Sequence, residues 1–337
     1  MIGGIAMKSP FTGKEMKRVY EKRTWNFRGE PYEYYHLSWK CEDTGEFFTT
    51  DESDTAGFVQ VTNQYRDKFG IPYTDEIIMV RNRYGISASK MSLVLGIGTN
   101  QYRLYEQGEV PNVSNGRMIR SIMNPKVMLG MVESSRNLFA SDAEYEKIAS
   151  KVSAVIERNR IEHQIEKYNE SRIFSCKRGA DNGYAQTSLE RLKNIMLYVL
   201  ERCGEVWYTK MNKLLFYIDF VSYREQGTAM TGLSYQAISY GPVPDRWDKV
   251  YSEFPEIIQE LRPAGEYTGS VLIPTAKADV SLFTEAELGI MDRVCSNMGR
   301  LTSRKLSELS HQEEAWIAYL GKQSHIPFGT AFFLNAV

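Results

Sequence analysis

The side chains with the clearest chemistry stand where a short helix is predicted to begin: Thr99, Asn100, Gln101 and Arg103. Asparagine or glutamine pairs bidentately with adenine N6 and N7, and arginine pairs with guanine or a phosphate. The start of a helix adds backbone N–H groups for a phosphate, and Lys90 would contact the DNA backbone from the preceding helix. We therefore expect these five residues to bind DNA. The alternative is a small helical bundle that contacts only protein.

Caps and chain breakers predict the helices that would position this group. The order of helix, glycine turn and helix, followed by Tyr105-Glu106 and a proline, is the frame of a five-helix repressor-type domain, whose second unit lies in the major groove. We expect Tyr105 in the core and Glu106 in an ion pair within the domain. Four helices are predicted in this block. Three of them are Asp75–Tyr84, Asn100–Gln107 and Ser114–Met123, and the fourth is capped by Ser87 or Ser89 and runs through Leu95.

A second group of binding residues surrounds the segment Tyr240-Gly241-Pro242-Val243-Pro244. Prolines stiffen a turn, and aromatic and arginine side chains dominate the binding energy of protein interfaces. The same residues are also typical of a structural turn and its core. For contact with a protein partner, the sequence favours Tyr240, Val243, Arg246 and Trp247.

No arrangement of side chains predicts catalysis. The sequence has no HExxH, GxSxG or Walker motif and no CxxC pair. The four histidines are scattered, and Cys203 and Cys295 are expected to be buried free thiols. We expect no catalytic residue, no metal, no cofactor and no enzyme activity.

Composition limits the kind of partner and the compartment. The 337 residues include 41 Lys+Arg and 42 Asp+Glu, a formal net charge of -1, which argues against binding nucleic acid by bulk charge alone. Four separated cysteines favour a reducing compartment. Because neither a leader sequence nor an apolar run near 18 residues is present, we expect a cytoplasmic protein with no membrane contact.

The N-terminal region has two turns of the same form, residues 9–14 and 41–46, around a predicted hairpin of Val19–Phe27 and Tyr32–Cys41. This region resembles the zinc-finger half of MqsA/YgiT-type antitoxins, which carry a CxxC pair at each turn. Zinc requires thiolate or imidazole ligands, but the four ligand positions read Ser9, Thr12, Cys41 and Thr44. We therefore expect a zinc-ribbon-like module without zinc, packed instead by its aromatic residues: Trp25, Phe27, Tyr34 and Trp39.

The helical block that follows also resembles those antitoxins, so that the resemblance covers roughly residues 7–130. Asn100 matches the asparagine of their recognition helix. Leu104 stands where an arginine is expected, and Arg103 lies one position earlier.

The C-terminal region resembles the Panacea domain, also called SocA-like or GepA-like, over about residues 188–328. The family's order and spacing are found in four segments: Lys210–Phe220, Thr231–Tyr235, Tyr240–Pro244 and Ser307–Trp316. The resemblance implies an antitoxin or adaptor domain that binds small toxins directly.

These patterns predict an α+β fold that is mostly α. A β-hairpin module like a zinc ribbon, without zinc ligands, is expected at residues 1–70 and a five-helix helix-turn-helix domain of the repressor type at 71–133. A helical linker is expected at 134–186, where Ser175–Gln186 lacks periodicity, and a helix-rich Panacea domain with a small β element at 187–337.

The combined hypothesis is a type II antitoxin. Its C-terminal domain would neutralise a cognate toxin by direct binding, and its helix-turn-helix would bind operator DNA as a homodimer and regulate its own operon. The alternative is a transcriptional regulator of a phage or other mobile element, or a proteolytic adaptor, without a cognate toxin.

Overall fold

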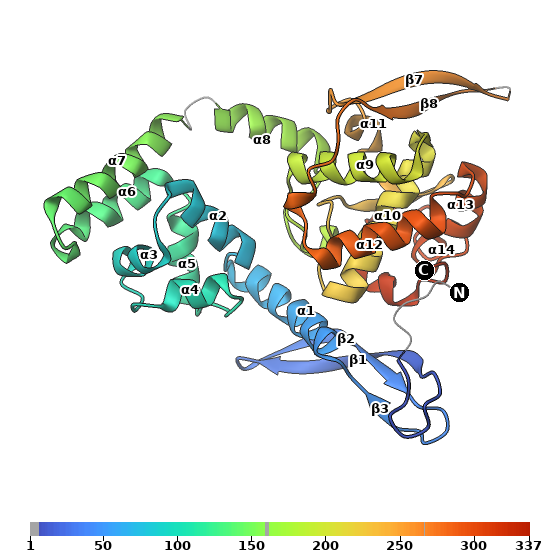
Figure 1. The fold of residues 1–337 in the computed structure, drawn as a ribbon, viewed down its shortest axis with the longest axis horizontal. Coiled ribbons are helices and arrows are strands. Elements are labelled where there is room, and N and C mark those ends of the chain that lie inside the picture. The colour runs from blue at the N-terminus through green and yellow to red at the C-terminus, as the bar shows by residue number, and fades with distance from the viewer. Residues whose placement is uncertain (1–6, 159–161, 266) are drawn as a thin grey trace. The chain divides into compact units, whose positions relative to one another are not determined.

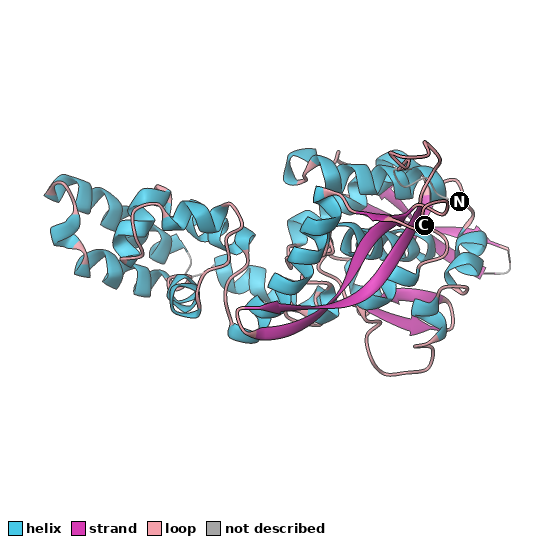
Figure 2. Cartoon of the chain, turned by 90° about the horizontal axis from the view of Figure 1, so that it is seen from below, coloured by secondary structure: helices cyan, strands magenta, loops and turns pink. Residues whose placement is uncertain are grey.

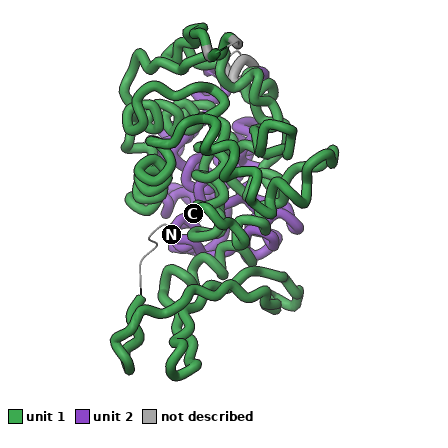
Figure 3. The backbone as a smooth tube through the Cα atoms, turned by 90° about the vertical axis from the view of Figure 1, so that its right-hand side faces the viewer, with its two compact units in different colours: residues 1–61, 169–337 green, residues 62–168 purple. Residues whose placement is uncertain are grey.

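The computed structural model describes residues 7–158, 162–265 and 267–337. Contacts divide the chain into two compact units (Figure 3): unit 1 holds residues 1–61 and 169–337, and unit 2 holds residues 62–168. The N-terminal module thus groups with the C-terminal region in the first unit. No helix among the described residues is both long and apolar enough to cross a membrane.

Unit 1 begins with a hairpin of β1 (Lys17–Phe27) and β2 (Glu30–Lys40), to which β3 (Phe47–Phe48) adds a short edge. The strands pair antiparallel over their whole length, and Arg28 and Gly29 turn the chain with φ of 50° and 85°, as a tight hairpin turn requires. The hairpin is where the sequence predicts it.

Helix α1 (Asp51–Phe69) packs its N-terminal part on this hairpin. The Gln60 side-chain amide accepts a hydrogen bond from the Tyr35 backbone N–H and donates one to the Tyr35 carbonyl, both at 3.0 Å. Phe58 brings its ring to 5.9 Å from Trp25 and 6.1 Å from Phe27. Aromatic packing therefore holds the module together, as expected, and α1 supplies part of it.

Unit 2 contains helices and, among its described residues, no strand (Figure 2). Ser87 caps a helix by accepting from the Lys90 amide at 3.4 Å, and Gly85 and Gly96 end helices in the left-handed conformation, the preferred C-terminal signal. The four predicted short helices are present as α2 (Thr74–Tyr84), α3 (Ala88–Leu95), α4 (Gln101–Glu106) and α5 (Val113–Ser121). Unit 2 also contains α6 (Pro125–Ser134), the 3₁₀ turn η1 (Arg136–Leu138) and α7 (Asp142–Arg158).

The larger part of unit 1 is built around α10 (Tyr208–Gln226), which is buried along most of its length. Helices α9 (Leu189–Cys203), α12 (Glu285–Met298) and α13 (Ser303–Ser310) pack on it. The remaining elements are α8 (Glu162–Ile173, shared with unit 2), η2 (Ala180–Asn182), β4 (Val206–Trp207), β5 (Tyr235–Ile238), β6 (Gly241–Pro244), α11 (Trp247–Val250), β7 (Ile257–Ala264), β8 (Tyr267–Pro274), η3 (Val280–Leu282), α14 (Glu314–Ile317) and η4 (Phe328–Phe333).

The strands of this part form two small antiparallel sheets, one of order β4-β8-β7 and one of β5 with β6. With the hairpin module they make the chain α+β and mostly helical, the predicted class. Two local expectations are wrong. The segment 241–244 is a strand rather than a turn, and 175–186 packs into unit 1 because the fully buried Asn182 donates to the Ala185 and Gly232 carbonyls.

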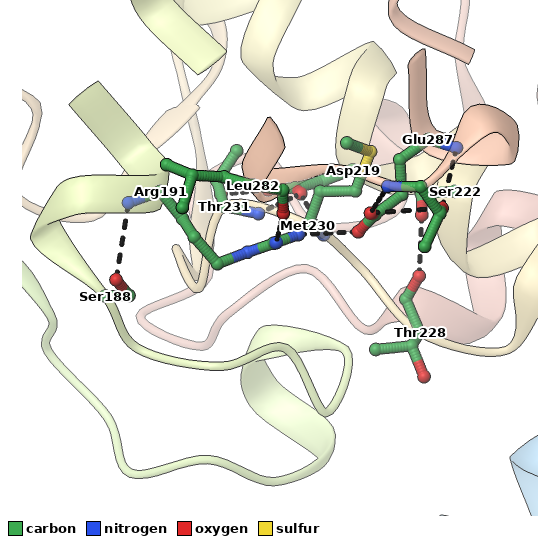
Figure 4. Close-up of polar contacts among 10 residues, drawn as sticks. Ser188, Arg191, Asp219, Ser222, Thr228, Met230, Thr231, Leu282 and Glu287 are labelled. Atoms are coloured by element: carbon green, nitrogen blue, oxygen red, sulfur yellow. Dashed lines mark hydrogen bonds and ion pairs between the residues drawn. The ribbon is translucent and has the colours of Figure 1, made fainter. Parts of the chain in front are cut away.

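One buried carboxylate ties α10 to the chain that follows it. Asp219 accepts hydrogen bonds from the Met230 and Thr231 amides, both at 2.8 Å, and from the Thr231 hydroxyl (Figure 4). The Tyr235 hydroxyl adds a fourth at 2.6 Å. Burial raises the pKa of Asp219, and these four donors oppose that shift. The partners of Asp219 thus come from the chain that follows α10 rather than from a cation.

Candidate binding surfaces

The residues expected to read DNA lie at the exposed start of α4. Thr99, Asn100 and Arg103 are exposed, and Asn100 is the N-cap residue, although its side chain makes no capping hydrogen bond. The Asn100 amide is therefore not used by the helix. Gln101 is partly engaged because its amide donates to Glu109 at 3.0 Å.

Lys90 is held within unit 2. Its ammonium lies 2.8 Å from a Glu144 oxygen, with both side chains about one third exposed. The Glu144 carboxylate neutralises this cation locally, and the Lys90 ammonium lowers the pKa of Glu144. Of the five predicted residues, Thr99, Asn100 and Arg103 are thus exposed, and no described residue forms an ion pair with them.

The frame behind α4 is fixed by buried polar contacts. The Tyr102 amide donates to Ser92 at 3.0 Å, and its hydroxyl donates to the Ile77 carbonyl at 2.9 Å. Arg81 and Glu106 form an ion pair at 2.5 Å. Together these contacts tie α4 to α2 and α3. The expected roles of Tyr105 in the core and Glu106 in an internal pair are both confirmed.

The two N-terminal turns, residues 9–14 and 41–46, have the same backbone geometry. Each has a glycine in the left-handed region, Gly13 at φ 68° and Gly45 at φ 75°. In the first turn, the Ser9 amide donates to the Lys14 carbonyl at 2.8 Å, and the Ser9 carbonyl accepts from the Gly13 amide at 2.9 Å. In the second turn, the Cys41 amide donates to the Glu46 carbonyl at 2.9 Å, and the Cys41 carbonyl accepts from the Gly45 amide at 2.8 Å. The turns are thus related to each other as the sequence suggests.

Side chains of both turns meet at Cys41. The Thr12 hydroxyl lies 3.8 Å from the Cys41 sulfur, and hydrogen bonds from Ser9 and Thr44 lower the pKa of the Cys41 thiol to about 6. One thiolate among three hydroxyls does not fit zinc, which needs anionic sulfur or imidazole at most of its positions. Within the described ranges, no group of three or more His, Cys, Asp or Glu residues is placed to hold a metal.

The four residues expected to contact a protein partner are placed differently from one another. Tyr240 is 76% exposed, at the turn between β5 and β6, whereas Val243 is buried at 3% exposure within β6. Arg246 donates to the Ser171 carbonyl, and Trp247 stacks on Tyr208 with ring centroids 5.6 Å apart. Tyr240 is the exposed member, and Val243 supports the strand.

Apolar side chains next to this turn complete a candidate surface that the sequence does not reveal. The Trp316 indole donates to the Ile238 carbonyl at 2.7 Å, which fixes α14 against β5. Beyond it, Ile317 is 60% exposed and Leu320 45% exposed. We define Tyr240, Ile317 and Leu320 as the apolar rim.

A buried cation lies under the same turn. Lys213 is 1% exposed, and no carboxylate among the described residues shifts its pKa. A Cβ placed on Gly241 would lie 3.1 Å from its ammonium, so the β6 backbone covers it closely. Burial lowers the pKa of Lys213 to about 8. Burial and the Lys213 charge lower the pKa of His311, whose ring stacks on Trp316 at 4.2 Å.

Residues 211–317 match the model of a protein family, described as Antitoxin SocA-like, Panacea domain. The matched segment runs from α10 to α14 and contains Asp219, the β5–β6 hairpin and most of the apolar rim. It supports the C-terminal resemblance. The match covers about one third of the chain and does not reach the hairpin module or unit 2. No curated protein and no solved structure matches the chain.

The N-terminal turns predict that a zinc site can be restored. Because their backbones already have matching geometry, the triple variant Ser9→Cys, Thr12→Cys, Thr44→Cys should bind one Zn²⁺ per chain through four thiolates. Elemental analysis of the purified protein measures this. The matched control adds Cys41→Ser and should bind zinc more weakly. Stoichiometric zinc in the unsubstituted protein, or none in the folded triple variant, would contradict the assignment.

Replacing Lys213 should stabilise the protein at neutral pH. The folded chain releases the Lys213 proton near pH 8 and the unfolded chain near 10.5, so stability rises with pH across that interval. Lys213→Met should therefore raise the free energy of unfolding at pH 7 by on the order of 3 kcal/mol, and by much less above pH 10. Urea unfolding at both pH values measures this, with the exposed Lys277→Met as control. A loss of stability at pH 7 would mean that the ammonium has a stabilising partner.

Proposed function

We propose that this chain is the antitoxin of a type II toxin–antitoxin pair. The observation that carries the proposal is the match of residues 211–317 to the SocA-like Panacea antitoxin domain. In this proposal the C-terminal part binds and neutralises a cognate toxin, while unit 2 binds operator DNA as a homodimer in the cytoplasm and represses its own operon. The chain itself carries out no chemical reaction.

Toxin binding in this proposal uses the apolar rim. Tyr240 stands on a hairpin stiffened by Pro242 and Pro244, and the Trp316 indole fixes α14 beside it. An aromatic residue on a rigid turn loses little conformational entropy on binding, and aromatic residues dominate interface energies. Neutralisation would then be steric: the rim covers the active surface of the toxin or holds the toxin in an inactive shape.

DNA binding in this proposal uses the start of α4. Asn100 and Arg103 are exposed, while Tyr102 and the Arg81–Glu106 pair keep the helix at a fixed position on α2 and α3. An asparagine at this point can pair with adenine, and the uncapped amides at the helix start can contact a phosphate. Because the chain has a net charge of -1, affinity must come from this local surface rather than from bulk charge.

Substitution of the apolar rim should abolish neutralisation. Tyr240→Ala and Ile317→Asp should each weaken binding of the toxin encoded beside this gene by tenfold or more. The reason is that a large side chain at the centre of an interface contributes about 2 kcal/mol to binding. Isothermal titration measures affinity, and growth on co-expression measures neutralisation. Leu261→Ala removes an apolar side chain that is equally exposed, at 72%, and should change neither. Unchanged binding in both rim variants, or shortened lifetime of the bound protein in cells, would argue against sequestration by this surface.

Substitution at the start of α4 should weaken operator binding. We expect a loss of about 1–3 kcal/mol for Asn100→Ala, with relaxed sequence preference, and a loss of affinity for Arg103→Ala. Mobility shift with the upstream region of the gene, at fixed salt, measures both. Gln107→Ala changes an exposed residue just beyond the other end of α4 and serves as the control. Retained operator affinity in both variants would remove α4 as the reading helix.

A further inference from the structure

Two cysteines lie together between α9 and α12 in unit 1. Cys203 is the last residue of α9 and is half-buried, whereas Cys295 stands in the last turn of α12 and is 5% exposed. Both are free thiols, and they form a hydrogen bond with each other. The other two cysteines have hydroxyl neighbours instead: Thr12 at Cys41 and Ser234 at Cys176.

Contacts on both sides of this thiol pair hold the ends of the two helices together. On one side, the Arg202 guanidinium lies 3.2 Å from the Asp292 carboxylate of α12. On the other side, the Lys210 ammonium donates to the Gly299 carbonyl at 2.5 Å. A Cβ placed on Gly299 would lie 2.5 Å from the Cys203 sulfur, so this sulfur lies directly on the backbone at the end of α12. The two thiols therefore meet without any rearrangement of the helices.

The two thiols differ in how readily they ionise. The hydrogen bond with Cys295 lowers the pKa of Cys203, and the Lys210 charge adds to this effect while burial opposes it. The same hydrogen bond and burial raise the pKa of Cys295. Because the thiolate and not the thiol is the nucleophile, Cys203 is the member of the pair that reacts first. It is also the more exposed of the two.

This arrangement fits a thiol pair that responds to oxidants. Oxidation-sensitive cysteines combine ready ionisation, access from solvent and a second thiol close by. A cysteine that only fills space in a core needs neither a second thiol nor a cation beside it. We propose that Cys203 and Cys295 form a reversible oxidation site, at which hydrogen peroxide converts the two thiols into a disulfide.

The reaction has two steps. First, the Cys203 thiolate attacks one oxygen of hydrogen peroxide: an S–O bond forms, the O–O bond breaks, and the departing hydroxide takes up the proton that Cys203 has released. Second, Cys295 loses its proton and its sulfur attacks the Cys203 sulfur: the S–S bond forms, the S–O bond breaks, and hydroxide leaves with that proton as water. The two thiols lose two electrons, and one peroxide becomes two waters.

The disulfide would restrain the part of the chain that carries the proposed toxin surface. The segment between the two cysteines contains α10 with Asp219 and the β5–β6 hairpin with Tyr240. A cross-link limits the unfolded chain more strongly when the loop that it closes is long. Oxidation should therefore stabilise this segment, and thiol reductants should reverse the effect. The step modifies the chain once and turns over no substrate.

Mass spectrometry of the folded full chain tests the proposal. The chain is treated with hydrogen peroxide, its remaining thiols are blocked, and trypsin then places the two cysteines in separate peptides, residues 203–210 and 294–300. We expect these peptides to be linked, at their summed mass less two hydrogens, and dithiothreitol to release both. The linked chain should also unfold several degrees higher on heating.

Three variants assign the roles of the two thiols. Cys295→Ser should leave Cys203 as a sulfenic acid that dimedone traps, and Cys203→Ser should leave Cys295 as an unmodified thiol. Cys176→Ser changes a cysteine elsewhere in unit 1 and should form the disulfide as the unsubstituted chain does.

Several results would overturn the proposal. The first is the absence of the linked peptide after treatment of the folded chain with millimolar peroxide, and the second is its formation only after unfolding in urea. Linkage through Cys41 or Cys176 in its place would contradict the pairing, and equally fast oxidation of Cys295 in Cys203→Ser would contradict the order of reaction. A linked chain that unfolds at the same or a lower temperature would contradict the restraint.

Discussion

Asp219 is the interaction on which the C-terminal part of the molecule depends. Its carboxylate is fully buried and receives four hydrogen bonds, two from backbone amides and two from the hydroxyls of Thr231 and Tyr235. An isolated carboxylate in such a place would be strongly destabilising. Four donors make the burial tolerable only if the chain after α10 follows one path, so the carboxylate selects that path.

That path determines the position of the binding surface. Tyr235, which donates to Asp219, is the first residue of β5, and β5 pairs with β6 to present Tyr240 at their turn. The Trp316 indole then attaches α14 to the β5 carbonyl of Ile238. A second buried carboxylate, Glu313, accepts from the Tyr217 hydroxyl on α10 at 3.1 Å. Polar contacts thus run from α10 to both sides of the apolar rim.

Local signals in the sequence were enough to place many elements. Ser87, Gly85 and Gly96 act within one helical turn of themselves, so the starts and ends of helices in unit 2 could be predicted. The two N-terminal turns could be recognised as a pair because their shared form lies in six consecutive residues. The exposed start of α4 was predictable for the same reason, since it depends on the glycines before it.

Long-range packing decided what could not be predicted. Prolines suggested a turn at 241–244, yet a proline is tolerated on an edge strand, and the segment pairs with β5. The Glu313 carboxylate accepts hydrogen bonds from Tyr217 and from the amides of Asn335 and Ala336, and these partners lie far from it in the sequence.

Hydrogen exchange of the full chain, alone and in complex, tests most directly the claim that the protein acts by binding at separate surfaces. With the toxin encoded beside it, the account predicts new protection in residues 235–244 and 314–320. With operator DNA it predicts protection around 99–104, and neither partner should protect the other's segment. Toxin-induced protection confined to unit 2, or no change at the β5–β6 hairpin while the toxin is bound, would contradict it.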